Sequence, residues 1–126
     1  MHRIFQFPLF FGIFFFACKP SKGVYPNGPF TGKVVSHICT YYSIEILSGN
    51  MDPARYSKTW QDMDGIYHNI FSAKNFCYLD TLGLYQNDTF EFYLIPDTST
   101  QNCEACQVFE PLPPIYNSIK VTKINK

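Results

Sequence analysis

Alternating apolar and polar positions recur along most of the chain. The clearest case is residues 89–95, where Phe90, Phe92 and Leu94 alternate with more polar neighbours. A period of two is typical of a strand with one buried face and one wetter face. The polar residues 86–88 just before it predict a tight turn that opens this strand.

The same alternation predicts further short strands, and residues 76–79 are expected to form either another short strand or a bridge. Residues 51–65 lack a strand pattern. Asp52 followed by Pro53 indicates a single helical turn there, because aspartate caps a helix and proline fits its first position. The further predicted strands are residues 30–38, 41–47, 66–72, 106–109 and 117–124.

Five or six short strands without a long amphipathic helix predict an all-β domain over residues 30–126. The expected architecture is a small antiparallel barrel of five or six strands that is OB-like, with a β-sandwich as the alternative. Trp60, the only tryptophan, is expected to form a lid over the core; the alternative is a platform on which a ligand stacks.

Residues 1–17 follow a different pattern, with a positive start followed by an apolar run rich in phenylalanine. This run is shorter than the roughly 20 residues of a transmembrane helix but suits the core of a secretory signal. We therefore expect residues 1–17 to be a signal peptide. Residues 18–29, rich in proline, glycine and lysine, are expected to be a tether.

Residues 15–18, Phe-Phe-Ala-Cys, resemble the bacterial lipobox, in which a small residue precedes a lipidated cysteine. Cys18 stands where the apolar run ends. The resemblance implies cleavage before Cys18, acylation there (palmitate among the chains), and attachment to a bacterial membrane at the outer membrane or periplasmic face. Each buried methylene contributes about 0.8 kcal/mol, so several chains hold a domain firmly. An ordinary secretory signal or an uncleaved anchor is the alternative.

The charge of the chain limits the kinds of partner that it is expected to bind. The 126-residue chain carries ten basic and ten acidic side chains without a Lys/Arg cluster. Nucleic-acid binding requires a basic surface that neutralises phosphates, so we expect no nucleic-acid partner. The expected partners are the membrane, through the lipid, and a protein or glycan of the cell envelope.

Four cysteines remain once Cys18 is assigned to lipid. An even number in an exported chain predicts two disulfides. Cys39, Cys77, Cys103 and Cys106 allow three connectivities. We favour a local Cys103–Cys106 bond and a long-range Cys39–Cys77 bond.

The same cysteines are also compatible with thiol-redox chemistry or metal binding. Cys103 and Cys106 have the spacing of a redox dithiol, and with His37 and Cys39 they resemble a mixed zinc-ligand set. A thiol-redox or metal-binding envelope protein is therefore the alternative function. The favoured reading is that these cysteines form disulfides and that the domain holds no metal and no cofactor.

No local Ser/His/Asp set is present, so we expect no catalytic residue and no enzyme activity. The expected function is a non-catalytic binding or structural module of the envelope. Trp60 and Tyr85 are the aromatic side chains predicted to contact a partner.

Several short motifs give the chain a recognisable layout. It resembles small lipoproteins of Bacteroidota-type bacteria in the lipobox and in five later segments, a resemblance that spans most of the mature chain. The resemblance implies a lipid anchor and a small β domain, and no particular activity. The segments are residues 32–35 (GKVV), 69–72 (NIFS), 87–91 (NDTFE), 103–106 (CEAC) and 113–119 (PPIYNSI).

Overall fold

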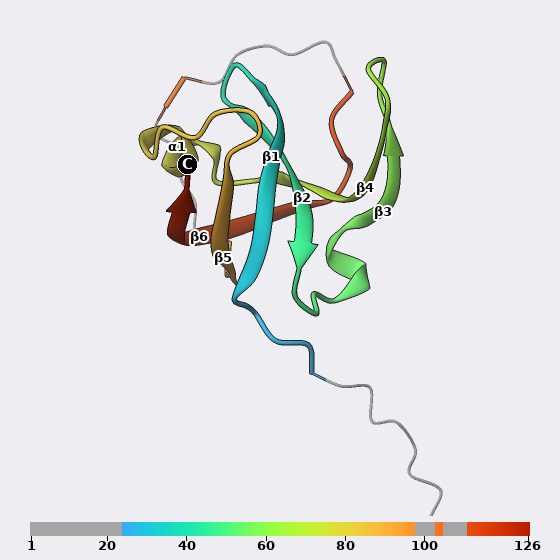
Figure 1. Cartoon of the computed structure of the whole chain (residues 1–126), viewed down its shortest axis with the longest axis vertical. Coiled ribbons are helices and arrows are strands. Elements are labelled where there is room, and N and C mark those ends of the chain that lie inside the picture. Colours follow the sequence, from blue (N-terminus) through green and yellow to red (C-terminus); the bar gives the residue numbers. More distant parts are fainter. Residues whose placement is uncertain (1–23, 98–102, 105–110) are drawn as a thin grey trace, which may run out of the picture.

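The computed structural model describes residues 24–97, 103–104 and 111–126 (Figure 1). This part of the chain forms six strands, one α-helix and one 3-10 helix. Neither of these helices is long and apolar enough to cross a membrane. In chain order they are β1 (Phe30–Ile38), β2 (Tyr41–Ser48), η1 (Pro53–Arg55), β3 (Ser57–Gln61), β4 (Ile66–Ala73), α1 (Phe76–Thr81), β5 (Thr89–Ile95) and β6 (Tyr116–Asn125).

Five of the strands close into a barrel. The sheet runs β2-β1-β5-β6-β4-β3. An additional pairing of the end strand β2 with β4 closes five of these strands into a ring and leaves β3 outside it. With β3 set aside, the ring connects its first, second, third, fifth and fourth strands, which is the OB order. The predicted OB-like barrel is confirmed. The expectation of a purely antiparallel barrel is wrong in one place, because β4 and β6 pair in parallel at Ser72↔Tyr116 and Ala73↔Asn117.

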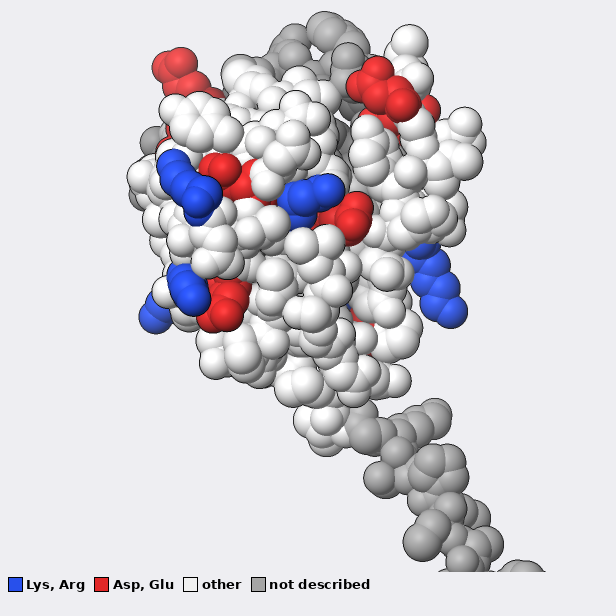
Figure 2. All heavy atoms as spheres, viewed as in Figure 1, with Lys and Arg blue, Asp and Glu red and all other residues white. Residues whose placement is uncertain are grey.

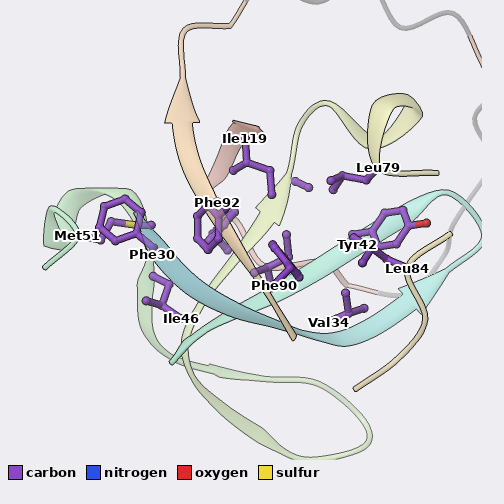
Figure 3. Packing of buried hydrophobic residues seen from close by; sticks show 13 residues of the cluster. Phe30, Val34, Tyr42, Ile46, Met51, Leu79, Leu84, Phe90, Phe92 and Ile119 are labelled. Atoms are coloured by element: carbon purple, nitrogen blue, oxygen red, sulfur yellow. The ribbon is translucent and has the colours of Figure 1, made fainter. Parts of the chain in front are cut away.

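β5, the strand with the clearest pattern, supplies the centre of the core (Figure 3). Phe90 and Phe92 are fully buried, and the Phe92 ring lies 5.6 Å from that of Phe30 and 5.8 Å from that of Phe71, centroid to centroid. Gly32 permits this packing, because a β-carbon there would lie 2.9 Å from the Phe92 ring. Tilted aromatic contacts at such distances stabilise the core beyond simple burial of area.

The polar turn before β5 is also confirmed. Asn87 adopts a left-handed backbone conformation (φ 73°), which asparagine tolerates better than most residues. The turn is held to β1 by two backbone hydrogen bonds, from the Asn87 N–H to the Val34 carbonyl (2.7 Å) and from the Val34 N–H to the Asp88 carbonyl (3.0 Å). It therefore extends the β1–β5 pairing beyond the last ladder residues.

Helix α1 completes the barrel where β4 and β6 diverge. The Asn75 side chain, just before α1, donates to the Ile119 carbonyl (2.6 Å) and accepts from the Ile119 N–H (3.0 Å). One turn further, the Tyr78 hydroxyl accepts from the Val121 N–H (3.2 Å) and donates to its carbonyl (3.4 Å). These side chains satisfy backbone groups of β6 that a neighbouring strand would otherwise pair.

The outer face of the barrel is covered where β2 and β4 pair. Ser43 lies opposite Ser72, and both side chains point away from the core because their neighbours Ile44 and Phe71 point into it. Even so, each serine is only 3% exposed. The Ser72 hydroxyl donates to the carbonyl of buried Pro113 (2.7 Å), so the chain leading into β6 covers this wall.

Two elements differ from the sequence prediction. Residues 76–79 begin helix α1 and form neither a strand nor a bridge, while β3 lies inside the excursion that shows no strand pattern. The predicted helical turn is confirmed as η1, with the Asp52 carboxylate accepting from the Ala54 N–H (2.9 Å). The strand predicted at residues 106–109 lies outside the described residues.

Replacing Asn75 by alanine is expected to destabilise the barrel strongly. Both the N–H and the carbonyl of buried Ile119 lose their partner, and each unpaired buried group costs about 1–3 kcal/mol, so we expect a loss of about 2–4 kcal/mol in the free energy of unfolding. Urea denaturation measures this loss. Asn50→Ala, at an exposed loop position, is the matched control and should stay within about 0.5 kcal/mol of the unmodified protein; equal effects of the two substitutions would contradict the assigned role.

Candidate functional site

Trp60 lies on a hairpin that stands beside the barrel, not over the core. β3 and β4 pair there, with Trp60 directly opposite Tyr67, and the two rings stack with centroids 5.8 Å apart. Trp60 is not among the side chains that pack on the hydrophobic core. The expectation of a lid over the core is therefore wrong, because the indole packs across its own hairpin.

The tip of this hairpin is organised by Asp62. Its carboxylate accepts hydrogen bonds from the N–H groups of Asp64 (2.7 Å) and Gly65 (2.9 Å). Burial, then the charges of Asp62 and Asp64 and a hydrogen bond to Asp62, raise the pKa of Tyr67. The aspartates therefore stabilise a turn and keep the tyrosine hydroxyl protonated.

Tyr85 lies at a different place on the surface. Its side chain is 69% exposed, as the sequence predicts for a residue that contacts a partner, and the Lys126 ammonium group lies 5.3 Å from its ring centroid. Lys126 also donates to the Gly83 carbonyl (3.0 Å). Among the described contacts none joins Tyr85 to Trp60, so the structure does not bring the two predicted binding residues into one site.

The cysteines pair differently from the favoured scheme. Cys77 of α1 is bonded to Cys103, with 5.5 Å between their α-carbons, so both the Cys103–Cys106 and the Cys39–Cys77 pairings are wrong. Cys39 is also disulfide-bonded, to a partner outside the described residues. In this state neither Cys39 nor Cys103 offers a thiolate, and the described residues contain no group of three or more side chains suited to hold a metal.

His37 packs against the most strongly shifted tyrosine. The two rings of His37 and Tyr42 stack with centroids 4.0 Å apart, and the His37 Nε2 is buried without a hydrogen-bond partner. Burial, followed by the charge of Asp80 and a hydrogen bond to it, raises the pKa of Tyr42 to about 12. The Tyr42 hydroxyl is therefore protonated at neutral pH and donates to Asp80, which is a structural arrangement.

A crevice lies at the end of the β5–β6 pair. Its volume is about 450 Å³, within the range of small-molecule sites. The N-terminal approach to β1, the end of η1 and the residue after β4 contribute to its walls. Lining residues are Asn27, Arg55, Lys74, residues 94–97 and residues 116–118.

The lining of the crevice includes an exposed tyrosine, a buried serine and charged side chains of both signs. Tyr116 is 47% exposed. Ser118 is only 5% exposed, and its hydroxyl has no hydrogen-bond partner. Lys74 forms an ion pair with Asp97, whereas Arg55 forms none with the carboxylates that the structure describes. Within the part of the chain that the structure describes, Arg55 is thus a crevice cation without an ion-pair partner.

Backbone contacts fix the crevice walls. The Asn117 side chain donates to the Arg55 carbonyl (2.6 Å), which holds η1 against β6. The Lys74 N–H donates to the Asn117 carbonyl (2.8 Å), and the Leu94 N–H donates to the Asn27 carbonyl (2.7 Å). Asn27, which the sequence assigns to the tether, is therefore already held against the barrel.

The surface charge is mixed elsewhere. On the face shown in Figure 2, basic and acidic side chains lie close together and do not separate into patches of one sign. Comparison of the chain with known protein families, curated proteins and solved structures finds no significant match. The crevice must therefore be interpreted from its own chemistry.

Sequence reasoning missed the crevice residues. Arg55, Lys74, Asp97, Tyr116 and Ser118 are scattered over more than half of the chain, and only the fold brings them together. Two signals pointed near them: the capped helical turn that contains Arg55, and the 113–119 motif that contains Tyr116 and Ser118.

The Tyr42 environment predicts a loss of stability in alkali. The folded protein keeps the Tyr42 proton up to a pKa of about 12, whereas an unfolded tyrosine loses it near its ordinary pKa of about 10. Its stabilising contribution is complete below about pH 10 and is lost as the pH rises towards 12. Tyr42→Phe should remove this part of the pH dependence, measured as unfolding free energy at about pH 9 and about pH 11. Tyr85→Phe, which alters an exposed tyrosine, should retain it.

Proposed function

We propose that this chain is a lipid-anchored protein of the bacterial cell envelope and that its barrel binds a partner without catalysing a reaction. The observation that carries the proposal is the combination of an apolar leader ending at Cys18 with a disulfide-bonded domain. Disulfides such as Cys77–Cys103 persist in oxidising compartments, where an exported protein resides. The resemblance to small Bacteroidota-type lipoproteins supports the same location.

A binding role is supported by the surface of the barrel. The crevice beside β6 has the size and the mixed lining of a small-molecule site. The shifted tyrosines, in contrast, are protonated at neutral pH and are explained by burial and by nearby carboxylates. Recognition therefore accounts for the described side chains better than acid–base chemistry does. The partner we propose is an envelope glycan or protein.

The anchor is tested by the mass of the mature N-terminus. Cleavage before Cys18 and acylation of that residue should give an N-terminal peptide that begins at Cys18 and carries the mass of its acyl chains, and the protein should fractionate with membranes. Cys18→Ser should abolish both the acyl mass and the membrane association, while Ser21→Ala leaves them unchanged. An intact Met1, or an unmodified Cys18 on the mature protein, refutes the anchor.

The state of the cysteines separates a binding module from the thiol or metal alternative. Purified without reductant, the protein should show no reactive thiol, and a non-reducing digest should yield the Cys77 and Cys103 peptides joined. Treatment with a chelator should leave the unfolding transition unchanged. Free Cys39 and Cys103 thiols together with stoichiometric zinc would instead establish the alternative.

A further inference from the structure

We propose that the crevice beside β6 binds a carboxylated sugar unit, of the hexuronate kind found in acidic polysaccharides. This inference rests on the proposed binding function and names its ligand class. The site is formed by Arg55, Tyr116 and Ser118, with the Lys74–Asp97 ion pair at its rim.

Arg55 provides the recognition of charge. Arg55 lines the crevice and has no carboxylate partner among the described residues, whereas the charge of Lys74 is matched by Asp97. Arginine binds carboxylates through paired N–H donors, with hydrogen bonds that are stronger than neutral ones. One unmatched arginine fits a ligand with one negative charge. It does not suit a polyphosphate chain, which requires several basic contacts.

Tyr116 provides the recognition of the sugar ring. The half-exposed tyrosine ring offers an apolar face with a polar tip, which suits the apolar face of a pyranose and its hydroxyls. Ser118 lies in the crevice wall beside Tyr116, with its hydroxyl oxygen enclosed by the protein, and it shapes the crevice. Ile95 and Pro96 add apolar surface beside these groups.

The rest of the barrel favours a small saccharide over a polymer laid across the sheet. OB barrels bind oligonucleotides and oligosaccharides on the face of their second and third strands, which here are β2 and β4. On that face Ser43 and Ser72 are buried, and the Ser72 hydroxyl donates to the carbonyl of Pro113. The crevice lies at a different place, at the end of the β5–β6 pair, and its entrance residues include exposed Asn27.

The test compares matched sugars on the full, disulfide-bonded protein in detergent. Saturation-transfer NMR titrations use D-glucuronate, D-glucose, which differs only at its sixth carbon, and inorganic phosphate as a competitor. Glucuronate should bind about tenfold more tightly than glucose, which corresponds to one charge-assisted contact. Phosphate should displace glucuronate only weakly. Equal binding of the two sugars, no saturation transfer to glucuronate, or phosphate that binds as tightly as glucuronate overturns the proposal.

Variants assign the contacts. Arg55→Gln keeps the backbone carbonyl that accepts from Asn117 and should abolish the preference for glucuronate over glucose. Tyr116→Ala should weaken both sugars, and Tyr116→Phe should restore most of the binding. The control variant Lys58→Gln on β3 lies outside the crevice and should bind as the unmodified protein does.

The folding of each variant is measured separately from its sugar binding. A variant is compared only if its Cys77–Cys103 peptides remain joined and its thermal transition stays within a few degrees of the unmodified protein. Unchanged glucuronate binding by a correctly folded Arg55→Gln variant refutes the ligand assignment even if Cys18 is acylated. Conversely, glucuronate binding to a protein that lacks acyl chains leaves the ligand assignment intact and removes the anchor.

Discussion

The fold depends on how the backbone edge of β6 is satisfied. Only two residue pairs join β4 to β6 before the strands diverge. Beyond them the Asn75 amide occupies the place of a strand residue and pairs with both backbone groups of Ile119, and the Tyr78 hydroxyl does the same at Val121. Buried backbone groups without partners are costly, so a barrel closed by so short a strand pairing requires these side chains. Asn75 and the helix α1 residue Tyr78 thus take the place that further β4 residues would have in the pairing with β6.

The same helix organises the surroundings of the crevice. Its Leu79 is fully buried in the core, and its Cys77 fixes Cys103 in the long connection between β5 and β6. Lys74, just before the helix, pairs its N–H with Asn117 and its ammonium group with Asp97. Lys74 thus positions Asn117 and Asp97, two other residues of the crevice wall. The segment that closes the barrel therefore also contributes to the geometry of the crevice.

The sequence predicts the barrel strands well because one face of each is buried. Phe90 and Phe92, or Tyr42 and Ile44, show the period of two that burial imposes. The alternation of apolar and polar residues does not predict β3, because its hairpin lies beside the core and neither face of the strand is fully buried. Helix α1 escapes it because six residues are too few to show a helical period.

The site is less predictable for a different reason. The pairing of Cys77 with Cys103 depends on where the long connection passes, and spacing along the chain does not contain that information. Arg55 and Tyr116 likewise meet only because η1 is held to β6 by the Asn117 side chain. Tyr85, predicted to contact a partner, is exposed beside the polar turn at residues 86–88.

The covered wall at Ser43 and Ser72 has a consequence for competition. The residue bonded to Ser72 on this wall, Pro113, belongs to the same molecule. The connection that leads to Pro113 is also joined to helix α1 by the Cys77–Cys103 bond. A polymer could lie against this wall only after displacing a segment of the protein itself.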